Sequence, residues 1–245
     1  MLRMKTEKTM KYKRIMLKLS GEAFLGDRAA GIDPEFTLKI AKQIKEVYDM
    51  GTELCIVIGG GNIFRGLSAA EHGLGRTTGD YIGMLATVMN SLALQESLEK
   101  IGLEVRVQTA LTIIEVAEPY IRRKAVNHIK RGRIVIFGAG SGNPYVTTDM
   151  AAVLRALEMD CEVIFKATKV DGVYDKDPAK HEGAVKYDRL KHDEVLINNL
   201  KVMDPSAIAL ARENETPIIV FDINKPGNIT KAILGENIGT IVTHL

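Results

Sequence analysis

Residues 134–157 read IVIFGAGSGNPYVTTDMAAVLRAL, and this stretch decides the fold class. Its apolar beginning predicts a buried strand, Gly138, Gly140 and Gly142 predict a tight turn, and the alanine-rich end predicts a helix that begins at Thr147. The backbone N–H groups of such a turn and the positive end of the helix dipole both attract anions. The stretch therefore indicates a strand, loop and helix unit that binds a phosphate or a carboxylate.

A single glycine-rich loop also occurs as an ordinary connection between a strand and a helix, so the loop alone leaves both interpretations open. The dinucleotide fingerprint G-x-G-x-x-G does not fit, because Asn143 stands at the position of its third glycine. Lys166 lies at the end of the next apolar run, where that fingerprint places an acidic ribose ligand. A nicotinamide enzyme is therefore disfavoured.

The composition indicates a soluble globular protein. The 245 residues are 46% hydrophobic and 26% charged, which is enough to bury the core of one α/β domain or two small ones. The net charge of +2, from 33 basic and 31 acidic residues, gives no general attraction to nucleic acid or to a membrane surface. Recognition of an anion must therefore be local.

The cysteines and the N-terminus predict a cytoplasmic protein. Cys55 and Cys161 lie beside apolar strand-like runs without C-x-x-C spacing, as expected for free buried thiols in a reducing compartment. The basic residues 1–11 are expected to be a flexible N-terminus. The apolar run that follows them contains Lys18 and is too short for a signal peptide or a membrane span.

Hydrophobic periodicity predicts strands that alternate with helices along the chain. This alternation predicts an α/β three-layer sandwich with a mostly parallel central sheet and with ligands at the carboxyl ends of the strands. Strands are predicted at 14–20, 54–58, 105–108, 134–137, 161–167, 218–221 and 240–242, with an edge strand at 184–187. Helices are predicted at 34–50, 80–100, 118–130, 147–159, 193–199, 205–214 and 228–234.

Four predicted strand ends carry polar or glycine-rich segments, at 18–21, 59–65, 138–149 and 166–177. If they meet at one sheet edge, they supply backbone N–H groups, cations and carboxylates, which are the groups that phosphoryl transfer requires. The P-loop motif is absent, since Leu67 stands where it requires lysine, and the protein-kinase motifs are absent as well. The residues by themselves therefore indicate an α/β protein that binds phosphate.

Five segments of the sequence, taken together, resemble the bacterial-type uridylate kinases of the amino acid kinase family. The resemblance extends from Tyr12 to the C-terminus, and the segments follow one another in the family's order. The segments are Tyr12–Glu22, Val57–Gly66, Gly83–Asn90, Gly142–Asp149 and Lys166–Tyr174.

This resemblance implies one domain over residues 12–245 with the amino acid kinase fold, also called carbamate kinase-like. Residues 12–165 would mainly bind UMP and the phosphates, and residues 166–245 would mainly bind ATP.

The implied reaction is the reversible transfer of the γ-phosphoryl group of ATP to UMP, giving UDP and ADP for pyrimidine nucleotide synthesis. Mg²⁺ would be carried with ATP rather than held by a protein metal site. The resemblance also implies a homohexamer, with UTP as a feedback inhibitor that fills the UMP site.

Carried over residue by residue, the resemblance implies three catalytic residues. Lys18 would neutralise charge on the transferring group, and Lys166 would be a second cation near the phosphates. Asp149 would orient the lysines or metal-bound water rather than act as a general base, because the UMP phosphate, with a second pKa of about 6, is already charged at pH 7. The implied ATP-binding residues are Lys18, Leu19, Ser20, Gly21, Gly61, Arg65, Thr168, Tyr174 and Asp177.

On the acceptor side, the resemblance implies that Asp80 binds the ribose hydroxyls of UMP, although the residue alone could also be a helix N-cap. Asp204 stands where the family also has an aspartate, and the sequence assigns no specific role to it. The helix around Gln95, Glu96 and Glu99 lacks an arginine and a histidine of GTP-activated members, which puts GTP activation in doubt. The implied UMP-binding residues are Gly60, Asp80, Ser141, Gly142, Asn143, Pro144, Tyr145, Val146, Thr147 and Thr148.

Two other functions share part of this pattern. A kinase of a small carboxylate such as glutamate, aspartate or carbamate would share the lysines and the glycine loops, but not Asp80 combined with the GNPYVTT segment. A non-catalytic nucleotide sensor could use the same pockets for regulation. Retention of Lys18, Lys166 and Asp149 disfavours the sensor, because binding alone does not need all three.

Overall fold

The computed structural model describes residues 10–64 and 73–244. Residues 1–9, 65–72 and 245 lie outside the described part. The predictions that fall on them therefore cannot be placed, namely most of the flexible N-terminus and the ATP contact at Arg65.

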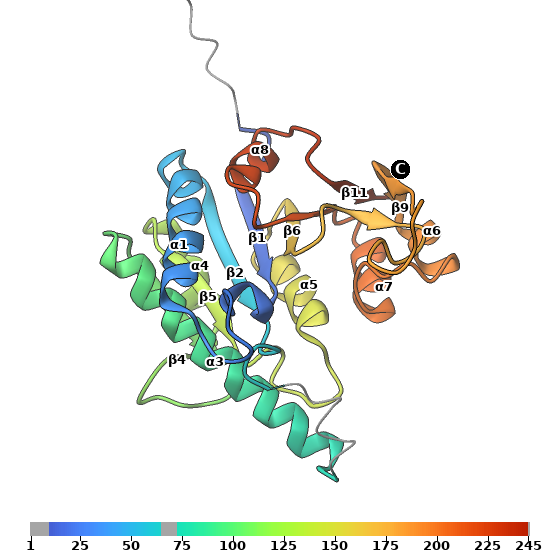
Figure 1. Ribbon diagram of the computed structural model, residues 1–245. Helices are drawn as coiled ribbons and strands as arrows, with labels where there is room; N and C mark the ends of the chain where they lie inside the picture. The colour runs from blue at the N-terminus through green and yellow to red at the C-terminus, as the bar shows by residue number, and fades with distance from the viewer. Residues whose placement is uncertain (1–9, 65–72, 245) are drawn as a thin grey trace, which may run out of the picture.

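One nine-stranded sheet runs through the molecule (Figure 1). Its strands are β1 (Arg14–Leu19), β2 (Glu53–Ile58), β3 (Val105–Thr109), β4 (Glu118–Pro119), β5 (Ile134–Gly138), β6 (Val163–Thr168), β9 (Arg189–Lys191), β10 (Ile218–Asp222) and β11 (Thr240–Thr243). The order across the sheet is β4-β3-β5-β2-β1-β6-β10-β11-β9. In this sheet, strands β10 and β11 pair antiparallel, and the other described pairs are parallel. The predicted mostly parallel sheet is confirmed.

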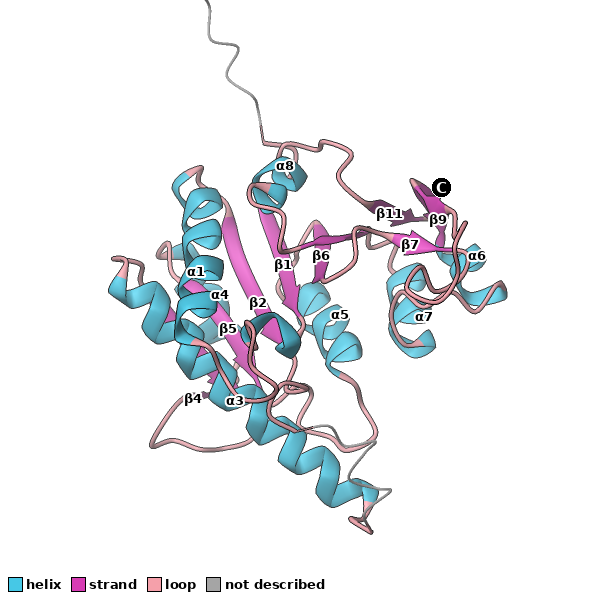
Figure 2. Cartoon of the chain, in the orientation of Figure 1, coloured by secondary structure: helices cyan, strands magenta, loops and turns pink. Residues whose placement is uncertain are grey.

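Helices cover both faces of this sheet (Figure 2). The apolar residues of α1, α3 and α8 pack on one face, and those of α4, α5 and α7 pack on the other. The helices are the 3-10 turn η1 (Gly21–Phe24), α1 (Pro34–Asp49), α3 (Arg76–Lys100), α4 (Arg122–Lys130), α5 (Thr148–Glu158), α6 (His192–Ile197), α7 (Pro205–Glu213) and α8 (Asn228–Ile233).

Side-chain alternation along β1 and β6 determines which residues face α5. Ile15, Leu17 and Leu19 of β1 belong to the core on the α1 side, whereas Met16 belongs to the core on the α5 side. Because side chains alternate between the faces of a strand, Lys18 is on the same face as Met16. The same alternation in β6 places Lys166 on that face.

The structure corrects two predicted elements. Glu118 does not begin a helix: Glu118–Pro119 is a two-residue edge strand paired with β3, and α4 starts at Arg122 after the extended residue Ile121. Proline fits an edge strand because it has no N–H to donate. The expected edge strand at 184–187 is shorter, and as β8 (Lys186–Tyr187) it pairs with β7 (Val173–Tyr174) in a separate two-stranded sheet.

The helix predicted from residue 80 begins at Arg76, four residues earlier, so Asp80 is not its N-cap. Both cysteines are free, with Cys55 buried as predicted and Cys161 partly buried. In the part of the chain that the structure describes, each helix is too short or too polar to span a membrane.

Candidate functional site

Two lysines and one carboxylate meet where β1, β6 and α5 come together. Lys18 and Lys166 are direct register partners in the paired strands β1 and β6. Their Nζ atoms lie 2.6 and 2.8 Å from the two carboxylate oxygens of Asp149, which is in the first turn of α5. The side chains are 11%, 13% and 16% exposed for Lys18, Lys166 and Asp149. The structure thus brings the three residues expected to be catalytic into direct contact.

The electrostatics of this cluster fix the charge of Asp149. Burial by itself would raise the pKa of its carboxyl, but the ammonium groups of Lys18 and Lys166 outweigh that effect and lower the pKa to about 2. Burial and the nearby Lys18 charge lower the pKa of Lys166, although Asp149 opposes the shift. A carboxylate that stays ionised to about pH 2 is a poor proton acceptor at pH 7, so Asp149 is suited to hold the lysines rather than to act as a base.

Glycines let the loops after β1 and β2 pack against each other beside this cluster. A Cβ atom on Gly21 would lie 2.5 Å from Asn62 Oδ1 and 2.8 Å from the Gly59 carbonyl oxygen. A Cβ atom on Gly60 would lie 2.7 Å from the carbonyl oxygen of Gly83 in α3. Gly61, in contrast, faces open space. The two loops therefore form a close-packed backbone surface, with Leu19 and Ser20 leading into it.

A buried amide pair that the sequence analysis missed supports these loops. Asn62 and Asn90 exchange two side-chain hydrogen bonds of 2.9 and 2.7 Å. The same amide groups also donate to the carbonyl oxygens of Gly31 and Gly59. An asparagine in a buried helical position was the available signal, because such a group must find partners.

The third glycine-rich loop connects β5 to α5 and has an unusual backbone. Four of its residues, Ala139, Gly140, Gly142 and Tyr145, have positive φ angles of 60°, 56°, 81° and 66°. Thr147 ends the loop as the N-cap of α5 by accepting the N–H of Met150. The predicted acceptor segment 141–148 thus reaches the helix N-terminus beside Asp149, with Ser141, Asn143, Pro144, Val146 and Thr148 along it.

Asp80 is bound to that loop from α3. Its carboxylate accepts the N–H of Tyr145 at 2.7 Å and two contacts of 2.9 Å from Nε of Arg76. The predicted acceptor residues Asp80 and Tyr145 are therefore in direct contact.

Asp204 has a defined structural role at the other side of the cluster. It is the N-cap of α7, where one carboxylate oxygen accepts the N–H of Ala207 at 3.0 Å. Its other oxygen accepts the hydroxyl of Thr147, the N-cap of α5. Asp204 therefore links the N-termini of two helices next to Lys166.

The residues expected on the ATP side occupy the end of β6 and the segment after it. Thr168 bonds the backbone of Val170, and Tyr174 donates its hydroxyl to Asp171 at 2.6 Å. That bond lowers the pKa of Asp171 and raises the pKa of Tyr174. Asp177 accepts the N–H of Ala179 within its own loop. The structure places Thr168 near the lysine cluster along β6, whereas Asp177 contacts its own loop.

The described residues contain no group of three or more acidic, histidine or cysteine side chains that could hold a metal ion. Both oxygens of Asp149 already contact lysines. Asp149 is therefore the carboxylate that this cluster would offer to a cation carried with the phosphates of a nucleotide.

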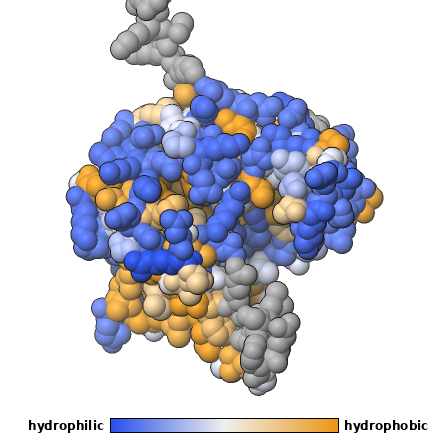
Figure 3. All heavy atoms as spheres, in the orientation of Figure 1, coloured by the Kyte–Doolittle hydropathy of each residue, from blue (hydrophilic) through white to orange (hydrophobic). Residues whose placement is uncertain are grey.

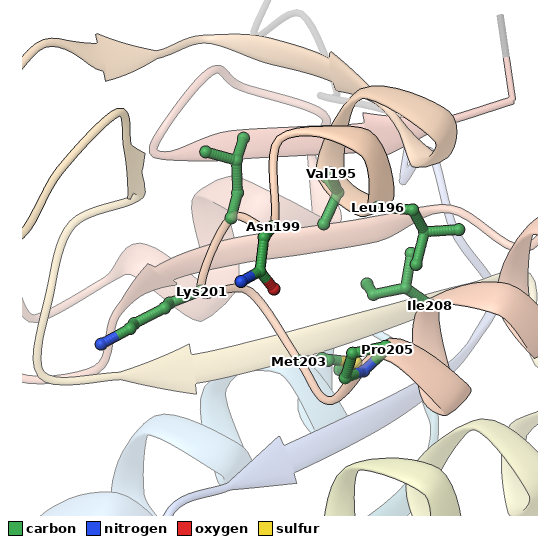
Figure 4. Close-up of a pocket in the computed structure, with 8 residues that line it drawn as sticks. Val195, Leu196, Asn199, Lys201, Met203, Pro205 and Ile208 are labelled. Carbon is green, nitrogen blue, oxygen red and sulfur yellow. The ribbon is translucent and has the colours of Figure 1, made fainter.

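A separate hollow of about 220 Å³ lies between α6 and α7 (Figure 4). Val195 and Leu196 of α6 face Ile208 of α7 across it, and Lys201 extends away from it. Its lining is mostly apolar and lacks the phosphate-binding groups of the lysine cluster.

The parallel strands bring two lysines, one ionised carboxylate and three glycine-containing loops to one edge of the sheet. These groups define a phosphate-binding α/β protein suited to phosphoryl transfer. Residues 13–222 match the model of the amino acid kinase family, and the chain belongs to that family.

Three solved structures extend the comparison over nearly the whole chain. UMP kinase from Bacillus anthracis is 43% identical over 95% of this chain and 96% of its own, with a TM-score of 0.92. UMP kinase from Ureaplasma parvum is 35% identical over 96% and 100%, with a TM-score of 0.90. Uridylate kinase from Archaeoglobus fulgidus is 31% identical over 94% and 99%, with a TM-score of 0.73. The family resemblance inferred from the sequence is confirmed.

Proposed function

We propose that this protein is a UMP kinase, which transfers the γ-phosphoryl group of ATP to UMP and yields ADP and UDP. The observation that carries the proposal is the Lys18–Asp149–Lys166 cluster at the edge shared by the three glycine-containing loops. The likeness to UMP kinases over at least 94% of the chain supports UMP as the acceptor.

In the proposed reaction, an oxygen of the UMP phosphate attacks the γ-phosphorus in line, and the bond from that phosphorus to the β–γ bridging oxygen breaks. Negative charge builds up on the bridging oxygen of ADP, so Lys18 and Lys166 stabilise the transition state. Asp149 keeps both ammonium groups in place and takes no proton. ATP carries Mg²⁺, which supplies further positive charge at its phosphates.

The nucleotides are proposed to bind on two sides of this cluster. Gly60, Asp80 and residues 141–148 take UMP, and residues 18–21, Gly61, Thr168, Tyr174 and Asp177 take ATP. Residues 12–165 then form mainly the acceptor side and residues 166–245 mainly the ATP side. Inhibition by UTP at the UMP site, a role in pyrimidine nucleotide synthesis and a cytoplasmic location remain predictions.

We also propose that a second copy of this chain covers one face of α3. Tyr81, Leu85 and Met89 follow one another at four-residue spacing and are 42%, 46% and 53% exposed. Figure 3 shows apolar surface gathered over the lower part of this helix. Such an exposed apolar stripe is typical of a subunit interface. Leu85→Glu is expected to lower the molar mass measured by light scattering, whereas an unchanged assembly would exclude this face.

The test of the function is ADP release from Mg·ATP with UMP, CMP, dCMP, AMP, GMP, glutamate and aspartate as parallel acceptors. Turnover that strongly favours UMP is the expected result. Turnover with an amino acid would replace the acceptor but keep the phosphoryl chemistry. Binding of UMP without turnover with any acceptor would indicate a nucleotide sensor.

A further inference from the structure

The pair of Arg76 and Asp80 at the start of α3 is not explained by helix stability. Arg76 is the first residue of the helix and so places a cation at the positive end of the helix dipole. A basic residue four positions before an acidic one is also the weaker order for such a pair. The N-cap, Gly75, makes no side-chain cap that could compensate. Local preferences are broken in this way mainly at functional sites.

The pair contacts the loop between β5 and α5 in two ways. Asp80 accepts the N–H of Tyr145 at 2.7 Å, and the guanidinium carbon of Arg76 lies 5.3 Å from the centre of the Tyr145 ring. Tyr145 has a φ of 66°, which a tyrosine rarely adopts, and it is 68% exposed. The start of α3 therefore holds an exposed aromatic ring in place on a strained loop.

Hydrogen-bond capacity remains in this arrangement. Nε of Arg76 contacts both oxygens of Asp80, and Oδ2 also accepts the N–H of Tyr145. A carboxylate oxygen accepts more than one hydrogen bond, so with respect to the residues that the structure describes Oδ1 retains capacity for a hydroxyl group. Within residues 10–64 and 73–244, the hydrogen bonds of Arg76 come from Nε, which leaves its terminal nitrogens as donors.

We propose that Arg76 is a positioning residue that makes the acceptor site selective for ribonucleotides over 2′-deoxyribonucleotides. The proposal rests on the proposed function. Arg76 acts through Asp80, whose carboxylate it holds toward the vicinal hydroxyls of the ribose. It also fixes Tyr145, whose exposed ring offers an apolar face to the pyrimidine base.

The test compares UMP and dUMP as acceptors in steady-state kinetics of the wild type, Arg76→Ala and Arg76→Lys. For Arg76→Ala, we expect KM for UMP to rise about tenfold while KM for ATP stays within about twofold. The ratio of kcat/KM for UMP to that for dUMP should fall by about tenfold, because the 2′-hydroxyl loses its oriented acceptor. For Arg76→Lys, this ratio should lie between the values of Arg76→Ala and the wild type, since lysine keeps the charge of arginine but not its planar fork.

A matched control is Lys45→Ala in α1, because Lys45 pairs with Asp49 at 2.9 Å with the same order and spacing. This variant should leave kcat/KM unchanged with UMP and with dUMP. The double variant Arg76→Ala/Asp80→Asn should show nearly the same UMP to dUMP ratio as Asp80→Asn alone, since both changes remove one interaction.

Equal losses with UMP and dUMP, or additive effects in the double variant, would overturn the role of Arg76. A purely structural role would produce that result, because a damaged fold does not distinguish a single hydroxyl. If the wild type itself does not phosphorylate UMP, the proposed function fails and this proposal fails with it. The wild-type measurement therefore separates the two failures.

Discussion

Replacement of Asp149 by asparagine removes the charge that holds Lys18 and Lys166 while almost preserving the side-chain shape. The pKa of Asp149 is lowered from 3.8 to about 2, and each unit corresponds to about 1.4 kcal/mol. The ionised carboxylate is therefore expected to contribute about 2 kcal/mol to the free energy of unfolding at pH 7.

The sign of this contribution gives it a pH dependence. The folded-state pKa is depressed, so the stabilisation is fully present above about pH 4 and is lost as the pH falls toward 2. About half of it should be lost at pH 3. Asp149→Asn should accordingly be less stable than the wild type by about 2 kcal/mol at pH 7, with a smaller difference at pH 3.

Urea denaturation at several pH values measures this difference, and initial rates with Mg·ATP and UMP measure its effect on catalysis. We expect kcat to fall by about 100-fold or more, because unpaired lysines no longer hold their transition-state geometry. Asp193→Asn is the control, since Asp193 pairs with Arg212 at 2.9 Å but is 63% exposed. That variant should change stability by about 0.5 kcal/mol or less. Equal stability of Asp149→Asn and the wild type at pH 7 would refute the reasoning.

Three further substitutions test separate parts of the site. Lys18→Ala should lower kcat by about 100-fold or more with a much smaller change in KM for UMP, and an unchanged kcat would exclude its proposed role. Asp80→Asn should raise KM for UMP by about tenfold and leave KM for ATP nearly constant, whereas equal weakening of both would show that Asp80 is assigned to the wrong nucleotide. Asn90→Ala should lower the free energy of unfolding by about 2 to 3 kcal/mol, because Asn62 and the Gly59 carbonyl lose buried partners; thermal denaturation within 1 °C of the wild type would contradict this.

Local sequence signals predicted much of the fold. The Asp33-Pro34 start of α1 is confirmed, with Asp33 accepting the N–H groups of Glu35 and Phe36. The apolar runs of β1, β2, β5 and β6 also lie where they were expected. These elements were predictable because an N-cap and a buried strand each depend on a few neighbouring residues.

Elements that depend on distant partners were predicted less well. Glu118–Pro119 continued the apparent helical pattern, but its pairing with β3 makes it a strand. The hairpin of β7 and β8 is too short to show periodicity, and it is held partly by the bond from the Val173 N–H to Thr240. Neither contact can be seen in the local sequence.

The sequence by itself determined which residues could bind phosphate, since continuous apolar runs led into Lys18, into Lys166 and into glycine-rich loops. Tertiary structure alone decided that the two lysines are register partners sharing Asp149, 131 positions after Lys18 in the chain. The same holds for the Asn62–Asn90 pair and for Arg76 beside Tyr145. Strand order and helix packing bring these groups together, and long-range contacts of that kind depend on the whole sheet rather than on any single segment.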